Sequence, residues 1–217
     1  MRESLDARKA RARNVIALLE RAYPDAKIAL HFTTPLELLV ATILSAQCTD
    51  ERVNMVTPAL FRKYRSAGDY ASLNPQALET AIRSTGFYRA KARAIVGMAQ
   101  ALIARHGGEV PRDREALVAL PGVGLKTATV VLGNAFGEQA IAVDTHVFRV
   151  AQRLGLAQSA NPVEIHDQLV QILPRKAWTR TSHLFQAHGR RTCMARKPAC
   201  PVCPVRAICP WPGKGVE

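Results

Sequence analysis

The chain has 217 residues, of which 48% are hydrophobic and 22% charged, and its formal net charge is +13. This balance is typical of a folded globular protein, and so basic a surface favours nucleic acid as the partner over a solvated face without one. No stretch is long and apolar enough to span a bilayer, and the N-terminus lacks the apolar segment of a secretory signal, so we expect a cytoplasmic protein with no membrane partner.

Apolar residues recur at helical spacing along most of the chain, and strand patterns are nearly absent. The pattern predicts an all-α protein of about ten short helices, arranged in two lobes. Proline, glycine or a capping residue marks most of the joints, Pro58 among them. In chain order, helices are expected near 15–22, 36–44, 52–64, 76–84, 89–105, 113–119, 126–136, 145–155, 163–172 and 176–188.

Lys126 follows directly on the glycine turn "LPGVG" of residues 120–124. Gly122, Val123 and Gly124 are expected to form a tight turn whose amides, at the start of a helix, bind an anion such as phosphate. The apolar helix behind Lys126 is expected to be buried on nearly all sides, and burial together with the helix dipole favours a neutral, nucleophilic amine. A lysine that only contacts phosphate is the alternative.

Asp144 stands just before the helical stripe of residues 145–155. Aspartate is a good N-cap, because its carboxylate accepts hydrogen bonds from the first amides of a helix. A capped carboxylate is also held rigidly, and beside Lys126 it can stabilise positive charge that develops on a sugar.

Four cysteines fall in one short stretch with the spacing C-x6-C-x2-C-x5-C, and their residues are Cys193, Cys200, Cys203 and Cys209. Clustered thiols without a secretory signal favour a metal site over disulfides, and the spacing leaves iron–sulfur and zinc both open. Arg196 and Lys197 lie between the first two cysteines, where they either contact phosphates or only keep the segment soluble.

With these residues the chain resembles the endonuclease III family of DNA glycosylases, in the superfamily named for a helix-hairpin-helix followed by a Gly/Pro-rich loop and an aspartate. The match rests on "LLVATILSAQCTD", "GFYRAKA", "LPGVGLKTA", "AVDTHVFRV" and "HGRRTCMARKPAC" with the remaining cysteines, and spans 28–209. The resemblance implies a six-helix domain over 28–138 with its hairpin near 113–136. It also implies a discontinuous helical domain over 1–27 and 139–217 with a cluster loop at 193–209, and a DNA-binding cleft between the two.

The resemblance further implies a base-excision-repair enzyme that removes oxidised pyrimidines from duplex DNA and then nicks the abasic strand by β-elimination. Lys126 matches the family's Schiff-base lysine and Asp144 its essential aspartate, while Gly122 and Gly124 match the phosphate-gripping hairpin. Gln47 and Phe87 match two positions that fill the space left by the displaced base, although Gln47 could be a plain helix-terminus residue and Phe87 a core aromatic. The four cysteines match the ligands of a [4Fe–4S] cluster.

Two residues depart from the family pattern: Leu125 stands where an arginine is frequent, and Phe87 where leucine is familiar. These two residues leave open how strongly the protein contacts phosphate and what it prefers on the opposite DNA strand. The competing interpretations are a glycosylase for mismatches or 8-oxoguanine, a non-catalytic iron–sulfur protein that binds DNA, and a zinc-binding tail. We expect a monomer that binds double-stranded DNA.

Overall fold

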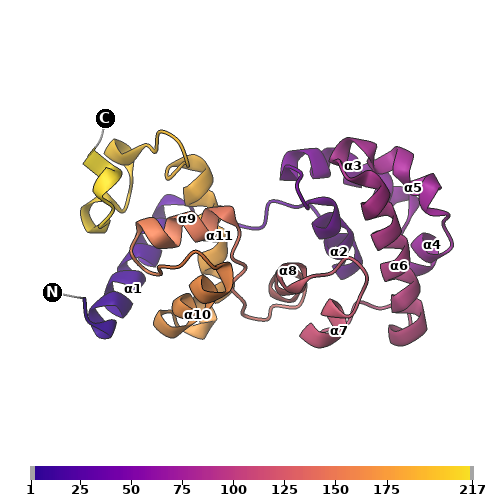
Figure 1. Cartoon of the computed structure of the whole chain (residues 1–217), viewed down its shortest axis with the longest axis horizontal. Helices are drawn as coiled ribbons and strands as arrows, with labels where there is room; N and C mark the ends of the chain where they lie inside the picture. Colours follow the sequence, from indigo (N-terminus) through magenta and orange to yellow (C-terminus); the bar gives the residue numbers. More distant parts are fainter. Residues whose placement is uncertain (1–2, 216–217) are drawn as a thin grey trace. The chain divides into compact units, whose positions relative to one another are not determined.

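The computed structural model describes residues 3–215, and these contain helices and loops but no strand, which confirms the all-α prediction (Figure 1). None of the described helices is both long and apolar enough to cross a membrane. The α-helices are α1 Leu5–Ala22, α2 Pro35–Leu44, α3 Asp50–Lys63, α4 Ala67–Ala71, α5 Pro75–Ile82, α6 Tyr88–His106, α7 Arg114–Val118, α8 Leu125–Ala135, α9 Thr145–Arg153, α10 Pro162–Ile172 and α11 Trp178–Arg191. The 3-10 helices are η1 Arg83–Thr85, η2 Arg175–Ala177, η3 Cys200–Val202, η4 Arg206–Ile208 and η5 Pro212–Gly215.

Contacts divide the chain into two compact units, each with its own apolar core. The central unit runs from Ile28 to Glu138, and the terminal unit takes the described residues up to Lys27 and from Gln139 onward. In the central unit α6 packs against α2, α4 and α5, while α8 packs against α2 and α7 (Figure 1). In the terminal unit α11 packs against α1 and α9.

Most helices begin where the sequence supplies a cap. Thr34 accepts a hydrogen bond from the Glu37 amide at the start of α2, and proline fills the first helical position. Such a residue satisfies one of the amides that a helix start leaves without a partner, and proline there loses no hydrogen bond. Asn161 and Pro162 repeat the arrangement at α10.

The structure corrects two expectations in the central unit. This unit contains seven α-helices rather than six, because α4, which begins with a capping box between Ser66 and Asp69, is too short to show apolar periodicity. Pro58 lies inside α3 rather than at a joint. The buried residues Val53 and Leu60 on either side of it hold the helix against the core despite the missing amide donor.

Candidate active site

The glycine turn joins α7 to α8, and Gly122 is the residue that requires glycine. Its φ of +74° is left-handed, and a Cβ built there would lie 2.6 Å from the Cβ of Ala94 on α6. Val123 is buried, and its amide donates to the carbonyl of Leu120 at 3.1 Å. The turn is therefore seated closely on α6, and only a residue without a side chain fits at its tip.

The first turn of α8 is open to solvent. Gly124 is the N-cap and provides no side-chain hydrogen bond to the helix amides, and nothing lies within 4 Å of a Cβ placed on it. Lys126 is exposed on this turn, and Leu125 before it is 61% exposed. Amides that lack a cap at the positive end of the helix dipole, next to an ammonium, form a site for an anion.

The expectation that α8 is buried on nearly all sides is wrong. Its buried face consists of Ala128, Val131 and Leu132, while other apolar residues of the helix are partly or largely exposed. The reason is that α2 and α7 are the helices packed against it within its unit, and they cover one side of an apolar helix. The central unit itself thus leaves Lys126 accessible to a ligand.

Asp144 is the N-cap of α9, as predicted from the sequence. One carboxylate oxygen accepts hydrogen bonds from the amides of His146 at 2.9 Å and Val147 at 2.8 Å. The second oxygen takes no part in the cap, because both cap bonds use the first. Burial lowers the pKa of the nearby His146, an effect that the charge of Asp144 opposes. Lys126 belongs to the central unit and Asp144 to the terminal unit.

Gln47 and Phe87 border a single pocket of the central unit, which Gly122 and the buried Lys91 also line. Both residues adopt a left-handed backbone, with φ of 52° at Gln47 and 47° at Phe87. Phe87 is 65% exposed, so it is not a core aromatic. Apart from Lys197, these are the only non-glycine residues with positive φ between residues 3 and 215. Such strain costs about 1–3 kcal/mol per residue and is typical of functional sites.

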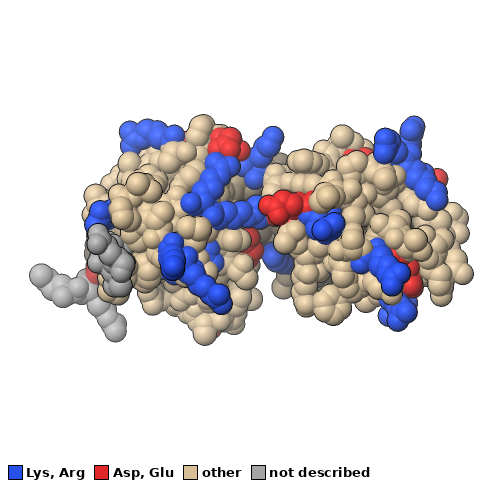
Figure 2. Space-filling view, turned by 90° about the horizontal axis from the view of Figure 1, so that it is seen from above, with Lys and Arg blue, Asp and Glu red and all other residues tan. Residues whose placement is uncertain are grey.

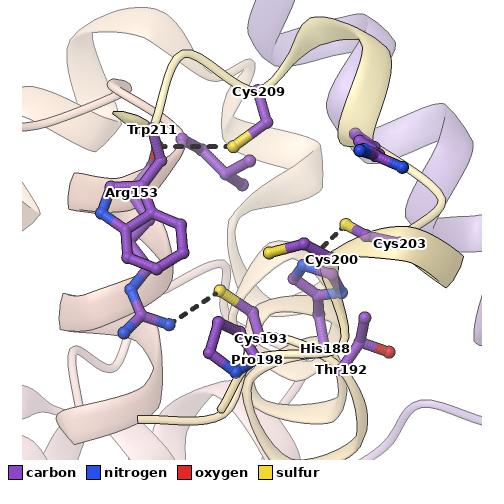
Figure 3. A pocket seen from close by; sticks show the side chains of 11 residues that line it. Arg153, His188, Thr192, Cys193, Pro198, Cys200, Cys203, Cys209 and Trp211 are labelled. Carbon is purple, nitrogen blue, oxygen red and sulfur yellow. Dashed lines mark hydrogen bonds between the residues drawn. The ribbon is translucent and has the colours of Figure 1, made fainter. Parts of the chain in front are cut away.

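The four clustered cysteines line one pocket of the terminal unit (Figure 3). Arg153 and Trp211 stack on one another at its side, with the guanidinium carbon 4.2 Å from the indole centroid. Buried His188 points at Cys203, with Nε2 3.9 Å from Sγ, and burial lowers the pKa of this histidine to about 4. None of these cysteines is paired in a disulfide. Among residues 3–215, no group of three or more His, Cys, Asp or Glu side chains forms a ready site for a metal ion.

Two arginines of α9 tie the cysteine segment to the helix that Asp144 caps. Arg149 donates to the carbonyl of Cys193 at 3.1 Å, and Arg153 donates to the carbonyls of Met194 at 2.7 Å and Ala195 at 3.0 Å. Sequence reasoning missed both arginines, although their spacing of four residues on one helix face was a usable signal.

Arg196 and Lys197 follow directly on the carbonyls that Arg153 holds, and both side chains are exposed. Lys197 has a φ of 50°, the third left-handed non-glycine residue of the described chain. Figure 2 shows Lys and Arg side chains spread over both units on the face drawn. The two exposed cations therefore follow a stretch of main chain that Arg153 holds by hydrogen bonds.

Comparison with known proteins identifies the family that this chain resembles. Residues 40–175 match the model of the HhH-GPD superfamily of base excision DNA repair proteins. The chain is 47% identical to the endonuclease III of Synechocystis over 205 residues, which cover 94% of each chain. Two solved structures, a non-covalent endonuclease III–DNA complex and a trapped endonuclease III–DNA covalent intermediate, each share 46% identity with a TM-score of 0.89 over 93% of this chain and 95% of the other.

The match extends over the glycine turn, Lys126, Asp144 and most of the described helices, and it does not favour the alternative activities. The chain belongs to the endonuclease III family of the HhH-GPD superfamily, and it is a DNA glycosylase of base excision repair with AP lyase activity.

Proposed function

We propose that the enzyme removes oxidised pyrimidines from duplex DNA through a Schiff base formed by Lys126, and that it also nicks abasic sites. The observation that carries the proposal is the open first turn of α8, where an exposed lysine follows amides without a side-chain cap. A trapped covalent complex with DNA exists for a relative of 46% identity.

The chemistry follows from the properties of the amine and the sugar. The damaged base leaves the stack at a cost of a few kcal/mol, which is lower for a poorly stacked lesion. The neutral amine Nζ of Lys126 attacks C1′ while the bond from C1′ to the base breaks. The electron pair of that bond leaves with the base, which takes up the proton that the nitrogen loses. Opening of the sugar ring gives a protonated imine, which acidifies the C2′ protons. Loss of one such proton expels the 3′ phosphate, and water then releases the lysine.

Asp144 stabilises the positive charge that develops on the sugar as the base departs. Its cap bonds to the α9 amides hold the carboxylate in a fixed orientation, so little reorganisation is needed when the charge appears. The structural and the catalytic role are compatible, because the cap uses one oxygen of the two.

Gln47 and Phe87 fill the space that the displaced base leaves. Both are exposed, both stand on left-handed backbone, and both border the same pocket. An exposed aromatic ring on strained backbone is costly for a free protein and suits a wedge between stacked bases. The larger ring of Phe87 is expected to influence which opposite base is preferred.

Phosphate contacts come from two places on the molecule. Gly122, Val123 and Gly124 present the hairpin and the open start of α8, and Arg196 and Lys197 present charge from the cysteine segment. Glycine at 124 leaves room for a phosphate to approach the amides closely. The expectations of a monomer and of a cytoplasmic location stay predictions.

We also assign a [4Fe–4S] cluster to the pocket of Cys193, Cys200, Cys203 and Cys209. The donor set fits, since four thiols line one pocket and a cluster takes one thiolate per iron. When bound, the cluster supplies a cross-link that holds a segment with little apolar core of its own. The hydrogen bonds from Arg153 to the carbonyls of Met194 and Ala195 then keep Arg196 and Lys197 in place.

Borohydride trapping tests the proposed chemistry directly. The protein is mixed with a duplex that carries one thymine glycol, borohydride is added to reduce the imine, and a covalent protein–DNA band is sought. Lys126→Ala should lose the band, and Lys63→Ala, which removes an exposed lysine of the same unit, should keep it. Base loss without a band would indicate a water-based mechanism, and no reaction on any oxidised pyrimidine or abasic site would refute the assignment.

A further inference from the structure

Lys91 is a buried lysine in the central unit for which neither the hairpin nor the proposed chemistry accounts. It lies one turn into α6 and is 5% exposed, and burial lowers its pKa. Its ammonium donates to two main-chain carbonyls, those of Leu44 and Thr85, each at 2.7 Å. A buried ammonium is unfavourable compared with an apolar side chain of the same length, and here its two hydrogen bonds to carbonyls offset part of that cost.

The two carbonyls lie at the ends of the helical segments that precede Gln47 and Phe87, which we call the wedge residues. Leu44 is the last residue of α2, three residues before Gln47, and Thr85 is the last residue of η1, two residues before Phe87. Carbonyls at the ends of helical segments lack partners within the helix and attract a cation. Lys91 therefore joins two segments that are far apart in sequence, immediately before each turns into left-handed backbone.

The pocket bordered by Gln47 and Phe87 also connects Lys91 with these two residues. Lys91, Gln47, Phe87 and Gly122 all line it, so the lysine whose ammonium binds the two carbonyls borders the same pocket as both wedge side chains. Left-handed backbone at a glutamine and a phenylalanine persists only where the surroundings fix it. A single side chain that binds the preceding carbonyl of both loops is such a constraint.

We propose that Lys91 is a positioning residue for base displacement: its ammonium fixes the spacing of the Gln47 and Phe87 loops so that both side chains enter the duplex together. This inference rests on the void-filling role given to those two residues in the proposed function. Lys91 takes no part in the bond-making steps, so its effect should appear only where a stacked duplex has to be opened.

Trapping rates on two DNAs test the inference. One substrate carries a preformed abasic site in a duplex, and the other carries the same site in a single strand, where no opposite strand needs a wedge. Lys91→Met keeps the aliphatic chain and removes the donors, and Lys63→Met is the matched control at an exposed position of the same unit. We expect Lys91→Met to be slowed about tenfold or more on the duplex and within about twofold of wild type on the single strand.

A second set of variants covers the case in which Lys91→Met folds poorly. Lys91→Gln keeps an amide donor and should give an intermediate duplex defect. In a Phe87→Ala background, which removes an exposed ring, substitution of Lys91 should add little further loss, because both changes disable the same wedge.

The outcomes distinguish a positioning role of Lys91 from a purely structural one. Lys91 would be purely structural if Lys91→Met and Lys91→Gln lowered the trapping rate equally on both DNAs, or if the loss caused by substitution of Lys91 added fully to that of Phe87→Ala. Either result would overturn this inference and leave the proposed function intact. Wild-type protein that forms no imine on either DNA would overturn the proposed function, and the inference with it.

Discussion

Substitution of Gly122 by alanine should destabilise the hairpin that carries Lys126. An alanine at φ +74° adopts a left-handed backbone, which costs about 1–2 kcal/mol. Its Cβ would also lie 2.6 Å from the Cβ of Ala94, so the turn or α6 has to shift, at about 1–3 kcal/mol. The sum is about 2–5 kcal/mol in the free energy of unfolding. Gly124→Ala, at an extended φ of −93° and with nothing within 4 Å, should change it by less than about 1 kcal/mol, because the main cost is that alanine is a poorer N-cap than glycine.

Urea unfolding of four proteins separates the two contributions. The set is wild type, Gly122→Ala, Ala94→Gly and the double variant. In the Ala94→Gly background the overlap is gone, so Gly122→Ala should cost only the backbone part, about 1–2 kcal/mol. The reasoning is refuted if Gly122→Ala unfolds like wild type, or if Ala94→Gly leaves the cost of Gly122→Ala unchanged.

Two further predictions concern charge. Asp144→Asn should keep the α9 cap, since asparagine caps as well as aspartate, and should change the free energy of unfolding by less than about 0.5 kcal/mol. Its rate of base excision should fall about 100-fold or more. Asp144→Ala should show the same loss of excision and also lower the free energy of unfolding by about 1 kcal/mol. Single-turnover excision beside thermal melting checks this, and an active Asp144→Asn would contradict it. Affinity for undamaged duplex should fall steeply with salt, and removal of Arg196 and Lys197 together should reduce the slope of log K against log salt by about 2. An unchanged slope in a fluorescence-anisotropy titration would exclude both as phosphate contacts.

Local features of the sequence were enough for the helical class and for the cap at α9. Helical spacing of apolar residues and a capping residue act within a few neighbours, so Asp144 could be placed at a helix start without any tertiary contact. The short helix α4 was missed because five residues are too few to show a repeated apolar pattern, although its Ala67 and Tyr70 are buried in the core.

Burial was where sequence reasoning failed. The apolar composition of α8 predicted a helix covered on all sides, yet its partners within the central unit cover one face and leave Lys126 exposed. Periodicity tells which residues share a face, but which faces are covered depends on neighbours that are distant in sequence.

The sequence by itself determined the helical class, the family motifs and the identity of the candidate nucleophile, carboxylate and thiols, because these depend on residue type and short-range spacing. The tertiary structure alone decided that Gly122 needs glycine while Gly124 is free of steric contact, and that Lys91 bridges the loops of Gln47 and Phe87. The close approach of the hairpin to the Ala94 side chain and the sharing of one ammonium by two distant carbonyls are contacts across the chain, and no local pattern encodes them.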